Sequence, residues 1–465
     1  MKKERVQEQN GVSKPTRSAV PFEPTFLAKL ESKLPQEFDA GEIDQLTHIF
    51  QNTIDQQLNG ILHFDGFFDK EIMQKAVFLS YYMESILGSR FIVTPKKAFW
   101  RRREDLLTQI SCEFIQVEDD VERAIFRFIT SPIDPRKELP LKVVFFRTKT
   151  NDILCLKASH EALDGTAVKE YLKLLSFLYS KLKEDPFYCP PVNGATNRSL
   201  KQIFQNLSLL QRLGVLLHLR AGKAVNSLPW KTQKAQNRRY EIILFTREQF
   251  RKIKALSKKM RISITDFIIT AFHRVIGRLA YFSPGKKVLS TITVNLRVYL
   301  PENATTPLCN LTSSANVYSR YRPDERIEKT LVKITKAMRK KKKRGIGLGS
   351  ALFCKWLFKL KFKKAEKILE KRIANQLQSN STFPVITNVG LTNPSDFAFS
   401  NLTLKDAYII PPFIKAPVFM MGALTFDEKL SFSIGYFEES YDSSLIRAFL
   451  EQMKEEMLSL AAISL

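Results

Sequence analysis

The 465-residue sequence has no uninterrupted apolar stretch of about 18 residues, so no helix is predicted to span a membrane. Its few cysteines form neither a CxxC pair nor a Cys/His spacing typical of zinc sites, and no metal site is expected. They are Cys112, Cys155, Cys189, Cys309 and Cys354. An odd, dispersed set favours reduced thiols in a cytoplasmic protein. Residues 1–20 lack the apolar stretch of a signal peptide and predict a disordered basic tail.

Acidic residues are scarce: 47 Asp and Glu stand against 73 Lys and Arg, which gives a net charge of +26. This excess predicts attraction to a polyanion, such as an anionic membrane face, nucleic acid or a phosphate-bearing substrate. Over half of the excess lies in residues 333–372, which contain 16 basic and two acidic residues. The basic character is therefore local. An apolar fraction of 44% with 35 Phe argues against general disorder.

The length and the irregular mixture of expected strands and helices favour an α/β fold with mixed sheets in two lobes. The first lobe is expected at residues 21–195 and a helical crossover at 196–237. The second lobe is expected at 238–465, including a basic amphipathic insertion at 333–376. A segment rich in proline, Pro186–Arg198, is the best linker candidate.

Hydrophobic periodicity predicts the main elements. Strands are expected at Asn59–Phe64, Phe91–Thr94, Ile110–Val117, Leu141–Arg147, Asp152–Ser159, Tyr240–Phe245, Val288–Asn295, Leu311–Tyr318, Pro384–Gly390, Ala407–Ile410, Pro417–Phe426 and Glu428–Tyr436. Helices are expected after Asp69, over Thr166–Leu182 and Leu200–Leu219, after Thr246 and Ser263, and at the C-terminal end after Asp442 or Ser443. Thr246 and Ser263 each begin a capping box.

The clearest candidate for chemistry is His160, which directly follows the buried-looking strand Asp152–Ser159. A strand end holds a side chain rigidly, and neutral imidazole is well matched to proton transfer near pH 7. Asp164 can fix the following turn through an ion pair, and Gly165 lets the chain turn into a helix. The spacing alone also fits an ordinary structural histidine. The remaining histidines are predicted to be structural: His48, His63, His218 and His273.

The segment His160-Glu-Ala-Leu-Asp164-Gly165 resembles the HxxxDG motif of an acyltransferase superfamily. This superfamily includes peptide-synthetase condensation domains, chloramphenicol acetyltransferase, plant BAHD acyltransferases and alcohol acetyltransferases. Further similar segments, from about residue 59 to 455, are Leu62–Gly66, Leu87–Phe91, Ile262–Asp266, Thr293–Arg297, Thr387–Gly390 and Gly422–Leu450. The resemblance implies two chloramphenicol acetyltransferase-like lobes with a tunnel between them.

Two differences from the motifs of this superfamily indicate which of its branches the sequence resembles most. Condensation domains usually carry a second His before the catalytic one, where this chain has Ser159. The DFGWG element of BAHD enzymes is missing. Both differences favour the alcohol acetyltransferase-like branch over peptide-bond formation.

The resemblance also implies residue roles. His160 would be the general base in transfer of an acyl group from acyl-CoA or an acyl carrier to a hydroxyl or, less favoured, an amine. Asp164 and Arg297 would form a structural ion pair beside Gly165. Asn388 and Gly390 are candidates for the oxyanion site or tunnel wall, although a structural strand end fits them equally. No permanently bound cofactor is implied, and a monomer is expected.

The basic segment predicts a surface function. Lys355, Lys359 and Lys363 repeat at helical spacing with Trp356 at the edge of the stripe, a pattern typical of a helix in a membrane interface. Such a protein would be peripheral on the inner membrane face, with a lipid-like acceptor. The alternatives are a solvated helix face and a site for an acidic carrier protein. Nucleic acid is disfavoured because no nucleic-acid-binding motif accompanies the charge.

Three functions remain open from the sequence. The first is a thioester-dependent acyltransferase. The second is a carrier-protein-dependent condensation enzyme of peptide or lipopeptide synthesis. The third is a catalytically silent binding protein, disfavoured because His160, Asp164 and Arg297 are all present.

Overall fold

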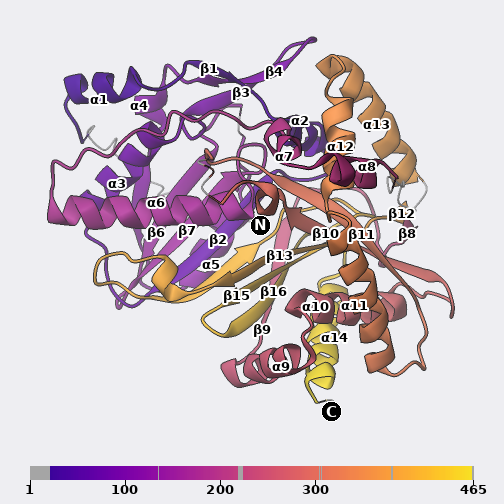
Figure 1. Ribbon diagram of the computed structural model, residues 1–465. Coiled ribbons are helices and arrows are strands. Elements are labelled where there is room, and N and C mark those ends of the chain that lie inside the picture. The colour runs from indigo at the N-terminus through magenta and orange to yellow at the C-terminus, as the bar shows by residue number, and fades with distance from the viewer. Residues whose placement is uncertain are drawn as a thin grey trace, which may run out of the picture.

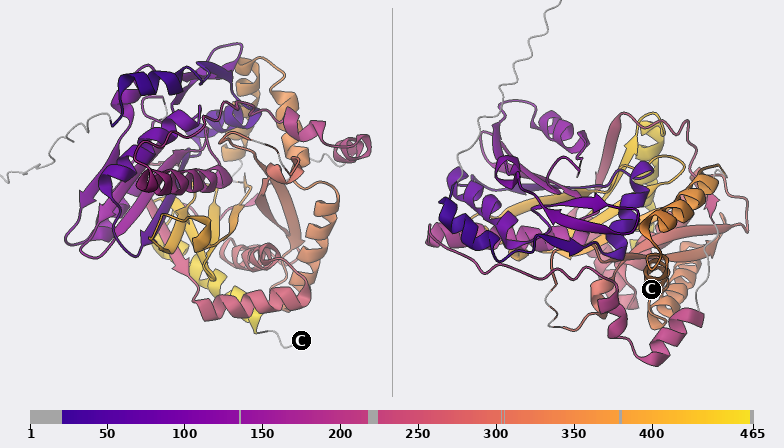
Figure 2. Two further views of the ribbon diagram at one scale, coloured as in Figure 1. Left: turned by 60° about the vertical axis from the view of Figure 1, so that its left-hand side comes forward. Right: turned by 90° about the horizontal axis from the view of Figure 1, so that it is seen from above.

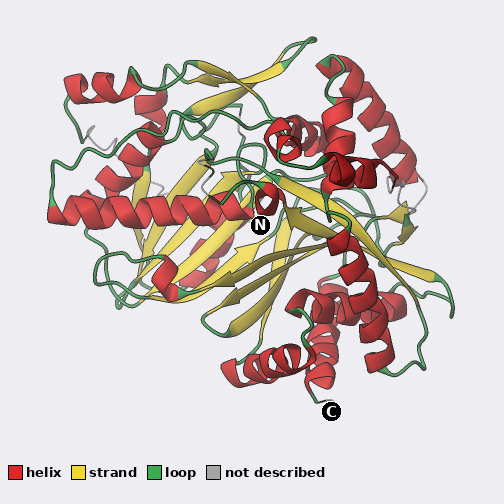
Figure 3. Ribbon diagram, in the orientation of Figure 1, coloured by secondary structure: helices red, strands yellow, loops and turns green. Residues whose placement is uncertain are grey.

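The computed structural model describes residues 21–462 except 135, 218–223, 303, 305 and 379–380. The predicted tail at residues 1–20 lies outside the described residues. Two main sheets, one in each lobe, are surrounded by helices, and the lobes meet along the middle of the molecule (Figure 1, Figure 3). The predicted mixed α/β class and two-lobed arrangement are confirmed.

The first-lobe sheet has five strands in the order β14-β2-β7-β6-β5. These are β2 (Gln57–Phe64), β5 (Cys112–Gln116), β6 (Leu141–Arg147), β7 (Asp152–Ser159) and β14 (Leu404–Ile410). Helices α3 (Lys70–Met83) and α6 (Gly165–Glu184) cover one face, and α5 (Val121–Thr130) packs on the other. Every residue of β7 is buried, which explains its nearly continuous apolar sequence.

The second-lobe sheet has six strands in the order β11-β10-β13-β15-β16-β9. These are β9 (Arg238–Leu244), β10 (Lys287–Asn295), β11 (Thr312–Arg320), β13 (Val385–Thr392), β15 (Met420–Phe426) and β16 (Lys429–Phe437). Its core also contains side chains of α9 (Arg247–Met260), α10 (Ile264–Leu279), α11 (Ile327–Lys343) and α14 (Ser443–Ala461). The predicted capping boxes at Thr246 and Ser263 begin α9 and α10.

Smaller elements surround these layers. A three-stranded sheet contains β1 (Glu37–Asp39), β4 (Ala98–Arg102) and β3 (Ser89–Val93), and a two-stranded sheet contains β8 (Val225–Asn226) and β12 (Ser381–Thr382). The other helices are α1 (Pro24–Glu31), α2 (Glu42–Ile49), α4 (Leu106–Gln109), α7 (Lys201–Gln205), α8 (Leu209–Leu217), α12 (Leu348–Leu357) and α13 (Phe362–Gln378). Short 3₁₀ turns occur at Phe50–Asn52, Leu296–Tyr299 and Pro394–Asp396.

The structure corrects the predicted extent of the second lobe. Strand β14 falls within residues 238–465 but joins the first-lobe sheet, where Ala407 lies opposite Leu62 of β2. Sequence periodicity identifies a strand without identifying its partner, so the boundary could not show this crossover. The predicted helix at 200–219 is also interrupted: α7 and α8 are separate, and residues 218–219 lie outside the described residues.

The predicted lysine stripe is not one continuous helix face. Residues 358–361 separate α12 from α13, so Lys355 and Lys363 lie on different helices. Two apolar residues of α13, Phe362 and Leu369, are buried in the core of the first lobe. The expected insertion at 333–376 therefore begins inside α11, which packs in the second-lobe core, and ends on a helix that contacts the other lobe.

Candidate active site

His160 lies immediately after β7, where its backbone N–H donates to the carbonyl of Gln56 at 2.8 Å. Its ring Nδ1 lies 2.9 Å from the carbonyl oxygen of Leu163. A carbonyl can only accept, and this contact is shorter than the 3.2 Å between Nδ1 and the amide nitrogen of Asn310, so it favours a ring proton on Nδ1 and a lone pair on Nε2. Burial lowers the pKa of His160, against the opposing effects of the Leu163 carbonyl and the Asp164 carboxylate. Neutral imidazole is therefore the favoured form near pH 7.

Asn310 also holds the histidine, and sequence reasoning missed it. Its Nδ2 donates to the backbone carbonyl of His160 at 2.8 Å and lies 3.2 Å from Nδ1. Asn310 is buried and comes from the loop before β11, in the second lobe. It had no motif or spacing that distinguished it from other loop asparagines.

Asp164 caps the helix that follows the histidine. Its Oδ1 accepts from the backbone N–H of Ala167 at 2.8 Å, while Oδ2 accepts from Arg297 Nη1 and the backbone N–H of Leu311, both at 2.8 Å. Burial alone would raise the pKa of Asp164, but the Arg297 charge and these hydrogen bonds hold it below its usual value. The structure thus brings Asp164 and Arg297 together across the two lobes.

Gly165 is the first residue of α6 and needs no positive φ there. The predicted reason for this glycine, a sharp turn, is therefore wrong. A Cβ at this position would stand 3.5 Å from a methyl carbon of Val389 in the second lobe. The glycine instead leaves space in the wall of a cavity that both lobes form.

The cavity lies beside His160 and encloses about 900 Å³, its open mouth included. Most of its lining is apolar and includes Leu58, Leu62, Leu156, Val168, Leu172, Val389, Phe397, Ile409, Met420 and Leu424. A few polar side chains also line it, including His160, Lys169, Thr293, Thr312 and Thr387. An apolar cavity with a small number of polar groups at one position is typical of a site for an apolar ligand.

Asn388 and Gly390 are not among the residues that line this cavity, and their contacts fit the alternative of a structural strand end. The amide of Asn388 donates to Thr265 Oγ1 at 3.2 Å, and its oxygen accepts from the Gly390 N–H at 2.9 Å. Strand alternation directs neighbouring Thr387 to the cavity instead. Thr387 Oγ1 accepts from Thr293 Oγ1 at 3.0 Å, which leaves its own proton for another acceptor.

Lys169 connects the lobes at the cavity. It lies on α6 of the first lobe, and its Nζ donates to the carbonyls of Val389 at 2.7 Å and Leu391 at 3.3 Å in β13. Burial lowers its pKa to about 8. Lys169 falls within the helix expected at Thr166–Leu182, and no motif in the sequence singles it out.

No protein-family model and no curated sequence matches this chain. Solved structures match over nearly its full length. The epimerization domain from the third module of tyrocidine synthetase B has a TM-score of 0.64 at 16% identity, covering 92% of this chain and 98% of that one. Trichothecene 15-O-acetyltransferase from Fusarium sporotrichioides has a TM-score of 0.70 at 10% identity, covering 91% and 95%.

The first condensation domain of the CDA synthetase is also similar, with a TM-score of 0.65 at 12% identity, covering 92% of this chain and 96% of that one. The chain has the condensation-domain fold. Identities this low establish the fold alone. The predicted fold is confirmed, and the solved structures that share it include both condensation domains and an acetyltransferase.

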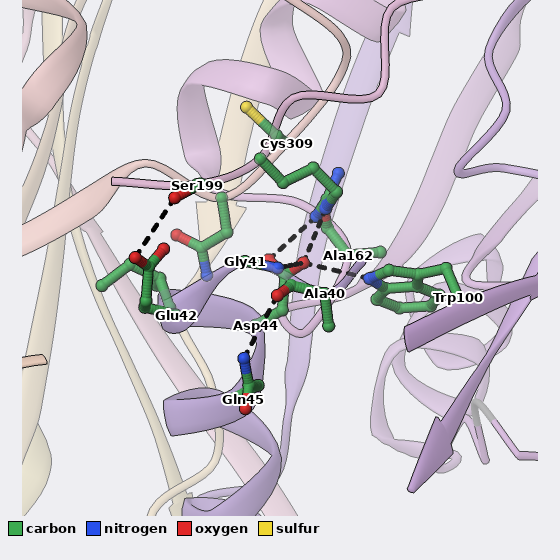
Figure 4. A network of polar contacts seen from close by, with 12 residues as sticks. Ala40, Gly41, Glu42, Asp44, Gln45, Trp100, Ala162, Ser199 and Cys309 are labelled. Atoms are coloured by element: carbon green, nitrogen blue, oxygen red, sulfur yellow. Dashed lines mark hydrogen bonds and ion pairs between the residues drawn. The ribbon is translucent and has the colours of Figure 1, made fainter. Parts of the chain in front are cut away.

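Within this condensation-domain fold, a second buried ion pair supports the histidine turn. Arg198 donates through Nε to Asp44 Oδ2 at 2.6 Å and through Nη2 to Asp44 Oδ1 at 2.9 Å. Nη2 also reaches the carbonyl of Ala162 at 2.6 Å, and Nη1 reaches the carbonyl of Leu308 at 2.7 Å. Trp100 Nε1 donates to the same carboxylate at 3.0 Å (Figure 4). Arg198 is 2% exposed, although its sequence predicted a linker.

Two of the other histidines, His273 and His48, have defined polar contacts. His273 is buried between the hydroxyls of Ser290 and Ser319, a structural setting in which burial lowers its pKa to about 3. His48 was also predicted to be structural, but it contacts the motif: its Nδ1 lies 2.9 Å from Glu161 Oε1. His218 lies outside the described residues. Within the described part of the chain, no group of three His, Cys, Asp or Glu could hold a metal, and no helix could cross a membrane.

Proposed function

We propose that the protein transfers an acyl group from a thioester to a hydroxyl or amine, with His160 as the general base. The observation that carries this proposal is the imidazole at the wall of an apolar cavity with its Nδ1 turned to the Leu163 carbonyl. Nε2 is then the nitrogen available to take a proton. General base catalysis of this kind contributes about 10²–10⁴-fold.

The proposed reaction has two steps. Nε2 of His160 removes the proton of the acceptor hydroxyl or amine as its oxygen or nitrogen attacks the thioester carbonyl carbon. The resulting tetrahedral oxyanion then collapses, the carbon–sulfur bond breaks, and the departing thiolate receives the proton from the imidazolium. Thr387 accepts a hydrogen bond from Thr293, so its own hydroxyl proton remains to be donated. Thr387 is therefore our candidate donor to the oxyanion.

The cavity lining supports an apolar acyl chain or an apolar acceptor. Burial of apolar surface contributes roughly 25 cal/mol per Å², so this lining favours a hydrocarbon group over a polar one. The donor is an acyl-CoA or an acyl group on a carrier protein. An O-acyltransferase is our first proposal, since the chain has Ser159 where condensation domains usually carry a second histidine.

A carrier-dependent condensation enzyme is the second candidate. Two observations favour it: condensation domains are among the similar structures, and the excess of basic residues suits an acidic carrier protein. The two candidates differ in donor. Turnover with free acyl-CoA supports the first, whereas turnover only with carrier-bound thioesters supports the second.

The deciding experiment measures thiol release from a panel of acyl-CoAs and carrier-bound acyl groups against alcohol and amine acceptors. His160→Ala should reduce release by about 10²–10⁴-fold while circular dichroism shows a folded protein. His63→Ala is the matched control, because His63 is half-buried on β2 but does not line the cavity. Equal activity of the parent and folded His160→Ala proteins would refute the assignment. Ligand binding without thiol release from any donor would support the silent binding protein.

A further inference from the structure

Helix α8 presents apolar side chains to solvent. Leu209, Leu210 and Leu213 are 74%, 82% and 55% exposed, and their spacing places them within one face of the helix. Val215, on the opposite side, is 4% exposed and packs in the core that α8 shares with α7 and α12. The helix projects from the body of the molecule (Figure 2). Three leucines exposed together on a projecting helix are unusual for a surface that faces only water.

The neighbouring helix α12 adds aromatic side chains. Trp356 and Phe353 are 44% and 38% exposed, one helical turn apart. The opposite side of α12, including Cys354, packs in the same core as Val215. The guanidinium of Arg372 on α13 lies 5.7 Å from the centre of the Phe353 ring, so a cation accompanies the exposed aromatic.

Basic side chains gather where α7, α8 and α12 meet. Lys355 lies over the Phe204 ring at 4.9 Å. Burial lowers the pKa of Lys355, Glu42 opposes this, and the positive charges of Lys359, Arg212 and Lys201 lower it further. The charges of three helices are therefore near enough to repel one another. Proximity of like charges is unfavourable in isolation and becomes favourable beside a polyanion.

We propose that α8 and the exposed face of α12 form a docking surface for an anionic lipid bilayer. Leu209, Leu210, Leu213 and Trp356 enter the interface between headgroups and acyl chains, while the cations around Lys355 contact lipid phosphates. Leucine and tryptophan beside lysine and arginine are typical of helices that lie in this interface. Each basic residue near the surface strengthens binding to anionic lipid.

The shape of the surface favours a bilayer over an acidic protein. A projecting helix can bury its leucines in a folded partner only if that partner has a matching groove. A bilayer admits them without one. The proposal concerns where the protein docks and is independent of the reaction that His160 performs. This surface takes the place of the predicted lysine stripe as the proposed membrane contact, because Lys363, one residue of that stripe, pairs with Glu366 on α13.

Flotation of the full chain with vesicles tests the proposal. Vesicles of equal parts phosphatidylglycerol and phosphatidylcholine should bind the protein at low salt, and pure phosphatidylcholine should bind it much less. Binding should weaken with added salt, because the Debye length falls to about 10 Å at 0.1 M. The double variant Leu210→Ser/Leu213→Ser should lose about tenfold or more in partitioning. Its control is Val298→Ser/Val332→Ser, at two residues that are 69% and 59% exposed elsewhere in the described chain.

Charge variants separate local docking from general attraction. Arg212→Gln/Lys359→Gln should lose about tenfold in partitioning, and Lys340→Gln/Lys343→Gln on α11, with the same loss of charge, should lose clearly less. Anionic vesicles should shift the emission of Trp356 to the blue, and Trp356→Phe should abolish this shift while the protein still floats.

Three results would overturn the proposal. One is equally poor flotation with anionic and neutral vesicles at low salt. Another is flotation of Leu210→Ser/Leu213→Ser at the parental level, with no change in Trp356 emission. The third is binding to a purified acidic carrier protein without vesicle binding, which would assign the surface to a protein. Melting temperatures of all variants near the parental value verify that they are folded.

Discussion

Replacing Arg198 with Met should strongly destabilise the protein. The change removes all four hydrogen bonds that the guanidinium makes to Asp44 and to the carbonyls of Ala162 and Leu308. Asp44, fully buried, retains only the donors of Gly41 and Trp100 among its described side-chain hydrogen bonds. Breaking a buried ion pair in this way typically costs about 3–5 kcal/mol, since the surviving charge is left without its partner.

The size of the fall in melting temperature shows whether the whole chain or a single lobe unfolds cooperatively. An unfolding entropy of roughly 2.1 cal/mol/K per residue converts a loss of about 4 kcal/mol into a fall of about 4 °C for the whole chain. The same loss lowers the melting temperature by about 10 °C if a lobe of about 200 residues unfolds alone. Scanning calorimetry measures both the temperature and the enthalpy, so it distinguishes these cases.

Arg101→Met is the control for Arg198→Met. Arg101 and its partner Glu37 are 43% and 47% exposed, and exposed pairs contribute only about 0–1 kcal/mol. The double variant Asp44→Asn/Arg198→Met should cost less than the sum of the single changes. The buried pair does not stabilise the fold if Arg198→Met has the same melting temperature as Arg101→Met. The same conclusion follows if the free-energy changes of the Arg198 and Asp44 substitutions are additive.

Three further predictions concern the other groups at the site. Asp164→Asn and Arg297→Met should each lower stability by about 3–5 kcal/mol, and urea unfolding should show that the double variant costs less than the sum. Folding lowers the pKa of Asp164 from 3.8, so its ionised form stabilises the protein above that pH. This contribution is lost as the pH falls through the lower pKa of the folded state. Asp164→Asn should therefore remove this part of the acid dependence of stability. The pKa of His160 is lowered from 6.5, so the acid limb of kcat/KM should have its midpoint below pH 6.5, and a midpoint above that pH would contradict His160 as the base.

The local part of the site could be predicted from sequence because its signals are local. An apolar run, a histidine, an aspartate four residues later and a helical period follow one another within Asp152–Leu182. Capping residues such as Thr246 and Ser263 also act on their own neighbours. The contact of Asp164 with Arg297 could be predicted only from the resemblance to a family, since 133 residues separate them.

The remaining parts of the site depend on long-range contacts that leave no periodic signal. Arg198 ends a loop rich in proline, which predicts a linker, yet its side chain is buried by residues from three distant segments. Strand β14 shows strand periodicity without showing that its partner is β2. The exposed face of α8 could not be predicted because its leucines have the pattern of a buried helix. Only the structure shows which of them face solvent.

One short segment of the second lobe explains why the histidine turn depends on both lobes. In Leu308–Thr312, each residue in succession contacts the turn or a side chain that holds it. The carbonyl of Leu308 accepts from Arg198, and that of Cys309 accepts from Arg297. The side chain of Asn310 donates to the His160 carbonyl. The Leu311 N–H and the Thr312 hydroxyl both donate to Asp164. The lobes therefore cannot separate at this segment without releasing the histidine. On the other side of the cavity, Lys169 of α6 donates to two carbonyls of β13, so the lobes are also joined there by hydrogen bonds from a first-lobe helix.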